Sequence, residues 1–203
     1  MKNANLLSAV DAREALEEGI LTSVELVEAC FERIDEVEES IGAWAHLDRE
    51  TSLEQARQAD SFRRRGLPLG ALHGLPVGIK DIIDTSDYPT ERGSVIYQGR
   101  TPTSDATLVS LLREAGAIIL GKTVTTELAV YTPGKTRNPH NTDHTPGGSS
   151  SGSAAAVAAG MVALSVGTQT NGSVIRPASY CGVYGFKPSF ARISRSGIMT
   201  QSK

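Results

Sequence analysis

The chain has 203 residues, of which 39% are hydrophobic and 21% are charged, and its formal net charge at pH 7 is -3. This length and composition are those of a globular protein with one hydrophobic core. The slight negative charge argues against a protein that binds nucleic acid through bulk electrostatics, because such proteins need an excess of lysine and arginine. We therefore expect no nucleic-acid partner.

The sequence also indicates in which cellular compartment the protein is expected. The first residues have a polar and acidic helical pattern rather than the basic and apolar regions of a signal peptide. The longest apolar run, 154–164, is far shorter than the roughly 20 residues that span a bilayer. The two cysteines, Cys30 and Cys181, are not in metal-ligand spacing, and free buried thiols are favoured over a disulfide. We expect a cytoplasmic protein with no membrane partner.

The pattern of residues 1–66 predicts a helical region. Thr22 and Ser23 can cap a helix whose apolar positions recur every three or four residues. Gly19 is predicted to end the preceding helix. A short strand is expected around 43–47, and a charged helix from about Arg49 to Gly66.

From Leu67 onwards the sequence pattern changes, and predicted strands alternate with predicted helices up to residue 203. The predicted strands are 76–83, 117–120 and 162–166, the predicted helices are 106–114, 154–160 and a short one after Ser173, and 182–186 is predicted to be another buried segment. This alternation predicts an α/β fold with a mixed, largely parallel sheet flanked by helices on both faces. There are no repeats and no clear second domain.

Residues 146–153, PGGSSSGS, have the composition of a flexible linker. The apolar segment that follows must be buried, however, whereas a linker should lead to a solvated boundary. A loop of small residues that enters a buried helix N-terminus is better suited to close contact with a ligand, since backbone N–H groups point outward there. The serines of this loop could then exchange protons.

A second turn of this kind lies within residues 167–181, GTQTNGSVIRPASYC. Thr170, Asn171, Gly172 and Ser173 present consecutive backbone N–H groups, and consecutive donors on a tight turn can hold a developing oxyanion. Ser173, at the end of this nest, is well placed as a nucleophile.

A serine hydroxyl needs a base to act as a nucleophile, but the four histidines lie outside the two turns. Lys80 is the candidate base because it sits in an apolar strand, where burial would favour its neutral form. The alternatives for Lys80 are exposure to solvent and pairing with Asp81 or Asp84.

Three segments together resemble the amidase signature family: GLPVGIKDIIDT around Lys80, PGGSSSGSAAAVAAG around Ser149, and GTQTNGSVIRPASYCGVYGFKPS around Ser173. They occur in the family's order, with 69 residues from Lys80 to Ser149 and 24 from there to Ser173. The likeness covers most of the chain and is closest to malonamidase-type members. It implies an amidase signature fold and a Ser-cisSer-Lys triad, in which Ser173 is the nucleophile, Ser149 the bridging serine after a cis peptide bond, and Lys80 the base.

The resemblance implies hydrolysis of a small carboxylic amide through an acyl-enzyme, without cofactor or metal. The oxyanion would lie on the N–H groups of residues 170–173, and Arg176, Gly148 and Thr168 would bind the substrate. A guanidinium suits a substrate carboxylate, although Arg176 equally suits a structural ion pair. The alternatives are an amidotransferase subunit that works with a companion chain, and an inactive fragment with a binding role. A homodimer is also left open.

The sequence departs from the family pattern in three ways. Asn171 stands where a second glycine is common, and Gln169 stands where many members have aspartate. Asparagine tolerates a positive φ better than most residues, so the turn can survive. Family domains are also longer, so that residues 1–203 would be a single partial amidase domain, its N-terminal half.

Three further patterns offer other chemistries. Residues 116–123, GAIILGKT, fit a phosphate-binding loop, but the glycine-rich loop should follow a strand, and here the strand-like run lies inside the motif. Residues 148–152, GSSSG, fit a nucleophile elbow centred on Ser150, but they lack the preceding strand and a downstream histidine. Cys181 could be a nucleophile, although its apolar neighbours favour a buried structural thiol.

Overall fold

The computed structural model describes residues 3–201, so the two residues at each end of the predicted domain lie outside it. Its α-helices are α1 (Ala9–Glu18), α2 (Ser23–Ile41), α3 (Arg49–Arg64), α4 (Thr107–Glu114), α5 (Ser151–Ala158) and α6 (Ile175–Tyr180). The strands are β1 (Trp44–Leu47), β2 (Pro76–Lys80), β3 (Ile118–Thr123) and β4 (Leu164–Val166). Three short 3-10 helices are η1 (Ala4–Leu6), η2 (Val95–Tyr97) and η3 (Glu127–Ala129).

The N-terminal helices begin and end at residues that suit those positions. Thr22 and Glu25 form a capping box at the start of α2, in which each side chain accepts from the other residue's backbone N–H. Gly19 and Gly42 end α1 and α2 in the left-handed conformation, which glycine adopts without steric cost. Residues 3–66 therefore form mainly helices, η1, α1, α2 and α3, with the short strand β1 between α2 and α3.

The four strands form one mixed sheet with the order β1-β3-β2-β4. β3 pairs with β2 in parallel, β2 pairs with β4 in parallel, and β1 runs antiparallel to β3. The predicted α/β fold with a largely parallel sheet is confirmed.

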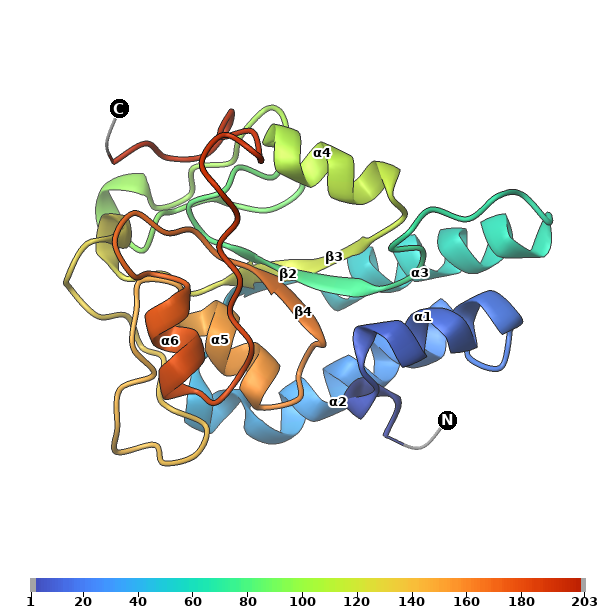
Figure 1. The fold of residues 1–203 in the computed structure, drawn as a ribbon, viewed down its shortest axis with the longest axis horizontal. Helices are drawn as coiled ribbons and strands as arrows, with labels where there is room; N and C mark the ends of the chain where they lie inside the picture. Colours follow the sequence, from blue (N-terminus) through green and yellow to red (C-terminus); the bar gives the residue numbers. More distant parts are fainter. Residues whose placement is uncertain (1–2, 202–203) are drawn as a thin grey trace.

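Helices cover both faces of this sheet, with α4 on one side and α2 and α5 on the other (Figure 1). Successive residues of a strand point to opposite faces. Accordingly Ile119 packs in the cluster that includes Val109 of α4, whereas Ile118 and Leu120 pack in the cluster with α2 and α5. Ile79 belongs to the α4 cluster. The next side chain, Lys80, therefore points to the face covered by α5.

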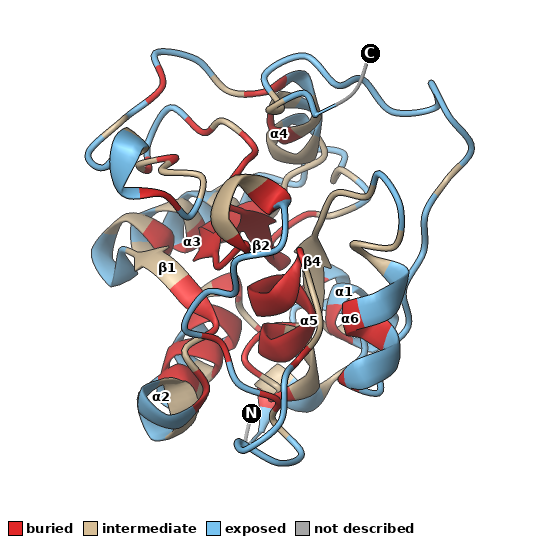
Figure 2. Cartoon of the chain, turned by 90° about the vertical axis from the view of Figure 1, so that its left-hand side faces the viewer, coloured by how far each residue is buried: buried red, intermediate tan, exposed pale blue. Residues whose placement is uncertain are grey.

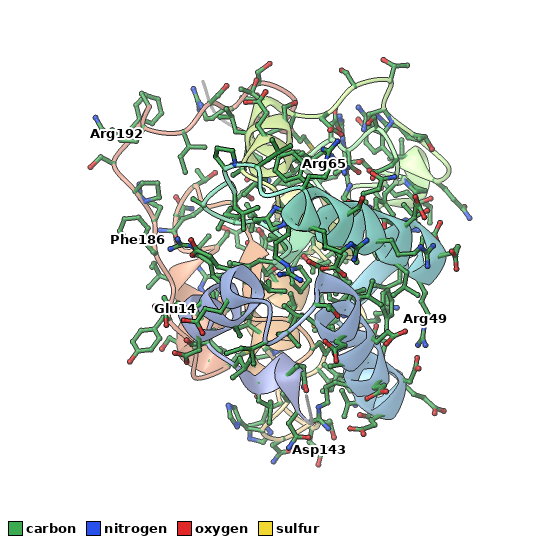
Figure 3. The ribbon with its side chains drawn as sticks, turned by 90° about the vertical axis from the view of Figure 1, so that its right-hand side faces the viewer. Glu14, Arg49, Arg65, Asp143, Phe186 and Arg192 are labelled. Atoms are coloured by element: carbon green, nitrogen blue, oxygen red, sulfur yellow. The ribbon has the colours of Figure 1, made fainter. Side chains whose placement is uncertain are left out.

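The prediction of a buried segment at 182–186 is wrong. Tyr184 is fully exposed and Phe186 is 83% exposed, and Figure 3 shows Phe186 at the periphery of the molecule. The chain after α6 runs as an exposed, irregular segment (Figure 2). An apolar run is buried only where other elements cover its side chains; here α6 lies against Gly185, but Tyr184 and Phe186 remain uncovered.

Other structural observations bear on membranes, metals and thiols. None of the helices within residues 3–201 combines the length and apolarity needed to cross a membrane. In the same range no group of three or more histidine, cysteine or acidic side chains could hold a metal ion. Cys30 and Cys181 are free and buried.

Candidate active site

Lys80 is the last residue of β2, and its side chain is completely buried. Its Nζ donates hydrogen bonds to Ser149 Oγ at 2.7 Å and to Thr168 Oγ1 at 2.9 Å. Burial lowers the pKa of Lys80 from its ordinary 10.5 to about 7, because desolvation disfavours the ammonium form. Lys80 can therefore be a neutral amine near neutral pH, with a lone pair able to accept a proton.

The two aspartates that follow Lys80 do not pair with it. Asp81 points to the opposite face of the sheet, where its carboxylate lies 3.4 Å from the buried Nζ of Lys122. Asp84 forms a bidentate pair with Arg100, with N–O distances of 2.8 and 2.9 Å. In residues 3–201 Lys80 has no carboxylate partner that would hold it in the charged form.

Ser149 lies in the loop that leads into α5, and the Gly148-Ser149 peptide bond is cis. Its carbonyl accepts a hydrogen bond from the Thr126 N–H at 3.1 Å, beyond the end of β3. The start of α5 is held closely against the sheet, since a Cβ added to Gly152 would come within 2.2 Å of the Ala43 carbonyl oxygen. Sheet contacts thus hold the serine loop beside the end of β2.

Ser150 joins this loop to the second turn. Its Oγ donates to the Thr168 carbonyl and accepts from the Thr168 N–H, both at 3.2 Å. The Ser150 N–H donates to the Ser173 carbonyl at 3.1 Å. These bonds bring the turn that carries Ser173 against the loop that carries Ser149. The Ser149 and Ser173 hydroxyls are not hydrogen-bonded to each other within the described residues.

The predicted oxyanion nest has free donors. The N–H groups of Thr170, Asn171, Gly172 and Ser173 donate no hydrogen bond within residues 3–201. Ser173 is only half-buried, at the start of the turn that leads into α6. A reacting carbonyl group could therefore reach both the hydroxyl and the unpaired donors.

The three residues expected to bind substrate lie in different settings. Arg176 is exposed, has no ion pair among the described residues, and lies against Gly172. Gly148 packs on Thr126, whose Cγ2 would be 2.9 Å from a Cβ added there. Thr168 contacts Lys80, a role that the sequence pattern did not indicate. The parallel pairing of β2 with β4, in which Ile79 lies opposite Val166, brings Thr168 alongside Lys80.

The rival motifs find no support in the structure. Gly121 and Lys122 lie inside β3, and Lys122 Nζ donates to Thr90 Oγ1 at 2.5 Å and to the Pro89 carbonyl at 3.1 Å. This lysine is buried and paired, whereas a phosphate-binding loop needs it free. The residues directly before Ser150 form an irregular loop and not the strand that a nucleophile elbow requires. Burial raises the pKa of Cys181 to about 11, which leaves little thiolate for nucleophilic attack.

Comparison with known proteins identifies the family of this chain. The sequence matches the Amidase family over residues 25–203, and the chain therefore belongs to that family. It is 45% identical over 205 aligned residues to a glutamyl-tRNA(Gln) amidotransferase subunit from Chloroflexus aggregans, covering 98% of this chain and 42% of that protein.

Solved structures show the same relationship. The peptide amidase from Stenotrophomonas maltophilia is 38% identical and superposes with a TM-score of 0.91 over 96% of this chain and 42% of the amidase. A fatty acid amide hydrolase is 31% identical, with a TM-score of 0.91 over 97% of this chain and 36% of the hydrolase. The chain spans about two fifths of the length of these relatives.

Proposed function

We propose that the site hydrolyses a carboxylic amide through an acyl-enzyme formed on Ser173. The observation that carries this proposal is the contact of a fully buried Lys80 with the Ser149 hydroxyl at 2.7 Å, without any acidic partner for the lysine among the described residues. A neutral amine can accept the Ser149 proton across this contact. Ser149 can then take the proton of Ser173 as that oxygen attacks.

The proposed reaction has two halves. Ser173 Oγ bonds to the amide carbon, its proton passes through Ser149 to Lys80, and the N–H groups of residues 170–173 stabilise the oxyanion. The C–N bond then breaks, and the leaving ammonia or amine takes the proton back through Ser149. Water attacks the resulting ester by the same relay, which releases the acid and restores the Ser173 hydroxyl.

Replacement of Ser173 by alanine is expected to abolish covalent modification of the protein. The measurement is mass spectrometry of the intact chain and its peptides after incubation with a fluorophosphonate, which modifies activated serines. Ser151→Ala is a matched control, because Ser151 is the first residue of α5 and its hydroxyl donates to the Val124 carbonyl instead of contacting Lys80. A label on Ser150, or on Cys181, would contradict the assignment of the nucleophile.

We infer further that the substrate carries a free carboxylate, as in malonamidase-type members. Arg176 offers an exposed guanidinium against the oxyanion turn, with no ion pair in the described part of the chain. Arg176→Ala should raise KM for carboxylate-bearing amides by about tenfold or more, the cost of losing one charge-assisted contact. Steady-state assays should show an unchanged KM for the matching neutral amides. Equal losses on both kinds of substrate would assign Arg176 to structure.

The 45% identity to a glutamyl-tRNA(Gln) amidotransferase subunit favours a second candidate function. In that case the ammonia released at Ser173 would pass to an acceptor on a companion chain. The two functions differ in their dependence on a partner. Ammonia release by the isolated chain supports the hydrolase, and release only after a companion chain is added supports the amidotransferase role.

We also propose that residues 1–203 act as one unit rather than as a separate N-terminal region and core. The hydrophobic cluster that contains Phe31 and Ile34 of α2 also contains Leu120 of β3 and Ala155 of α5. Burial of this shared cluster couples the helical region 1–66 to the helix that carries the serine loop.

A further inference from the structure

Gln169 bridges the two sides of the turn that carries Ser173. Its Oε1 accepts hydrogen bonds from the Val174 N–H at 2.9 Å and the Ile175 N–H at 3.0 Å. Its Nε2 donates to the Asn171 carbonyl at 3.1 Å. The side-chain amide of Gln169 thus makes three hydrogen bonds within one turn. It donates to a residue before Ser173 and accepts from two residues after it.

These bonds fix peptide planes, and a peptide plane fixes the direction of its N–H. The peptide group is planar and trans, so its carbonyl and N–H point in opposite directions. Holding the Asn171 carbonyl therefore sets the direction of the Gly172 N–H. The Gly172 carbonyl accepts from the Arg176 N–H at 2.8 Å, which sets the direction of the Ser173 N–H.

The plane after the nucleophile is held from both sides. The Val174 N–H is bonded to Gln169, and the Ser173 carbonyl at the other end of the same peptide accepts from the Ser150 N–H at 3.1 Å. Three consecutive peptide planes around Ser173 are therefore fixed, and Gln169 contacts the first and the third. The N–H groups of Gly172 and Ser173, which the bonds leave unpaired, are the ones proposed to stabilise the oxyanion.

We propose that Gln169 is a positioning residue for this reaction: its neutral amide holds the Gly172 N–H in the direction that stabilises the oxyanion, and it fixes the peptide plane that follows Ser173. This inference rests on the proposed function and adds a residue to it. In this chain the amide serves both sides, whereas a glutamate at the same position would accept from the two N–H groups but could not donate to the Asn171 carbonyl.

The variant Gln169→Glu separates this role from simple helix capping. Val174 and Ile175 stand at the start of α6, where an acceptor side chain caps the helix and a negative charge is favourable. Gln169→Glu is therefore expected to unfold at the same temperature as the wild type or a higher one. In this variant the fluorophosphonate should nevertheless modify Ser173 at least about tenfold more slowly than in the wild type. Loss of a correctly directed oxyanion donor lowers the rate of such a reaction by about 10²- to 10³-fold.

Gln169→Ala and Gln58→Glu complete the experiment. The alanine variant loses all three bonds and should also react slowly. Gln58 lies on α3, where its amide donates to Glu54, and its replacement should leave the rate of Ser173 modification unchanged. Wild-type reactivity of a stably folded Gln169→Glu protein would overturn the proposal and leave Gln169 as a helix cap.

The chemical shifts of the backbone amides, measured by NMR, test the inference independently of the proposed function. The Gly172 N–H signal should shift in both Gln169 variants but not in Gln58→Glu, because both variants lose the bond to the Asn171 carbonyl. If wild-type Ser173 is not modified at all, the proposed function fails, and the chemical shifts still decide whether Gln169 sets this N–H group. An unchanged Gly172 signal in the variants would overturn the positioning role.

Discussion

Replacement of Lys80 by alanine or methionine is expected to slow the acylation of Ser173 by about 10²- to 10⁴-fold, the usual range for loss of a general base. Lys80 is the only residue hydrogen-bonded to the Ser149 hydroxyl among those described. Without it the proton of Ser173 has no acceptor beyond Ser149. The rate of covalent modification by a fluorophosphonate, measured by mass spectrometry, gives the comparison without depending on a known substrate.

The pH dependence of the same reaction tests the charge state of the base. The pKa of Lys80 is lowered to about 7 by burial, and only the neutral amine can accept a proton. The wild-type rate should therefore rise with pH, reach half of its maximum near pH 7, and level off above. Lys80→Ala should show no such rise in this range.

Lys187→Ala is the matched control for loss of a lysine. Its side chain is exposed, and among residues 3–201 its Nζ donates a hydrogen bond only to the Pro188 carbonyl, so its removal should leave both the rate and the pH profile unchanged. A Lys80→Ala protein that folds and labels Ser173 at the wild-type rate would rule out the lysine as base. A wild-type rate that falls as pH rises through 7 would do the same.

The second large effect is on stability. In the unfolded chain Lys80 keeps its ordinary pKa near 10.5, whereas in the folded chain the pKa is about 7. Between these values the unfolded state binds one more proton than the folded state, so the free energy of unfolding rises with pH, by at most about 1.4 kcal/mol per unit. Relative to Lys80→Met, the wild type should gain about 4 kcal/mol between pH 7 and pH 10.

Urea unfolding of the two proteins at several pH values measures this difference. The comparison removes the contribution of Lys122, whose pKa is also lowered by burial, to about 8, and of every other group common to both proteins. The gain should saturate as pH approaches the ordinary pKa of lysine. Parallel stability curves for wild type and Lys80→Met would show that the folded protein holds Lys80 as an ammonium.

Much of this site can be read from the sequence, because each part lies in a local pattern. An apolar strand around Lys80 predicts burial of its amine, and two runs of small residues that precede helices predict turns with free N–H groups. The helix boundaries follow from local signals as well, such as the capping box of Thr22 and Glu25. These features depend on neighbours within a few residues, so composition and spacing are enough to indicate them.

Contacts between distant segments had to come from the tertiary structure. The sequence left Asp81 and Asp84 as possible partners of Lys80, and strand alternation together with Lys122 and Arg100 excluded both. The pairing of β2 with β4 placed Thr168 against Lys80. The hydrogen bonds of Gln169 showed that its side chain joins the two sides of the Ser173 turn.

The exposed apolar run 182–186 also shows what the sequence alone does not determine. A sequence by itself determines which side chains prefer burial and which backbone can turn, but strand register and packing decide which groups meet, because those free energies depend on residues far apart in the chain.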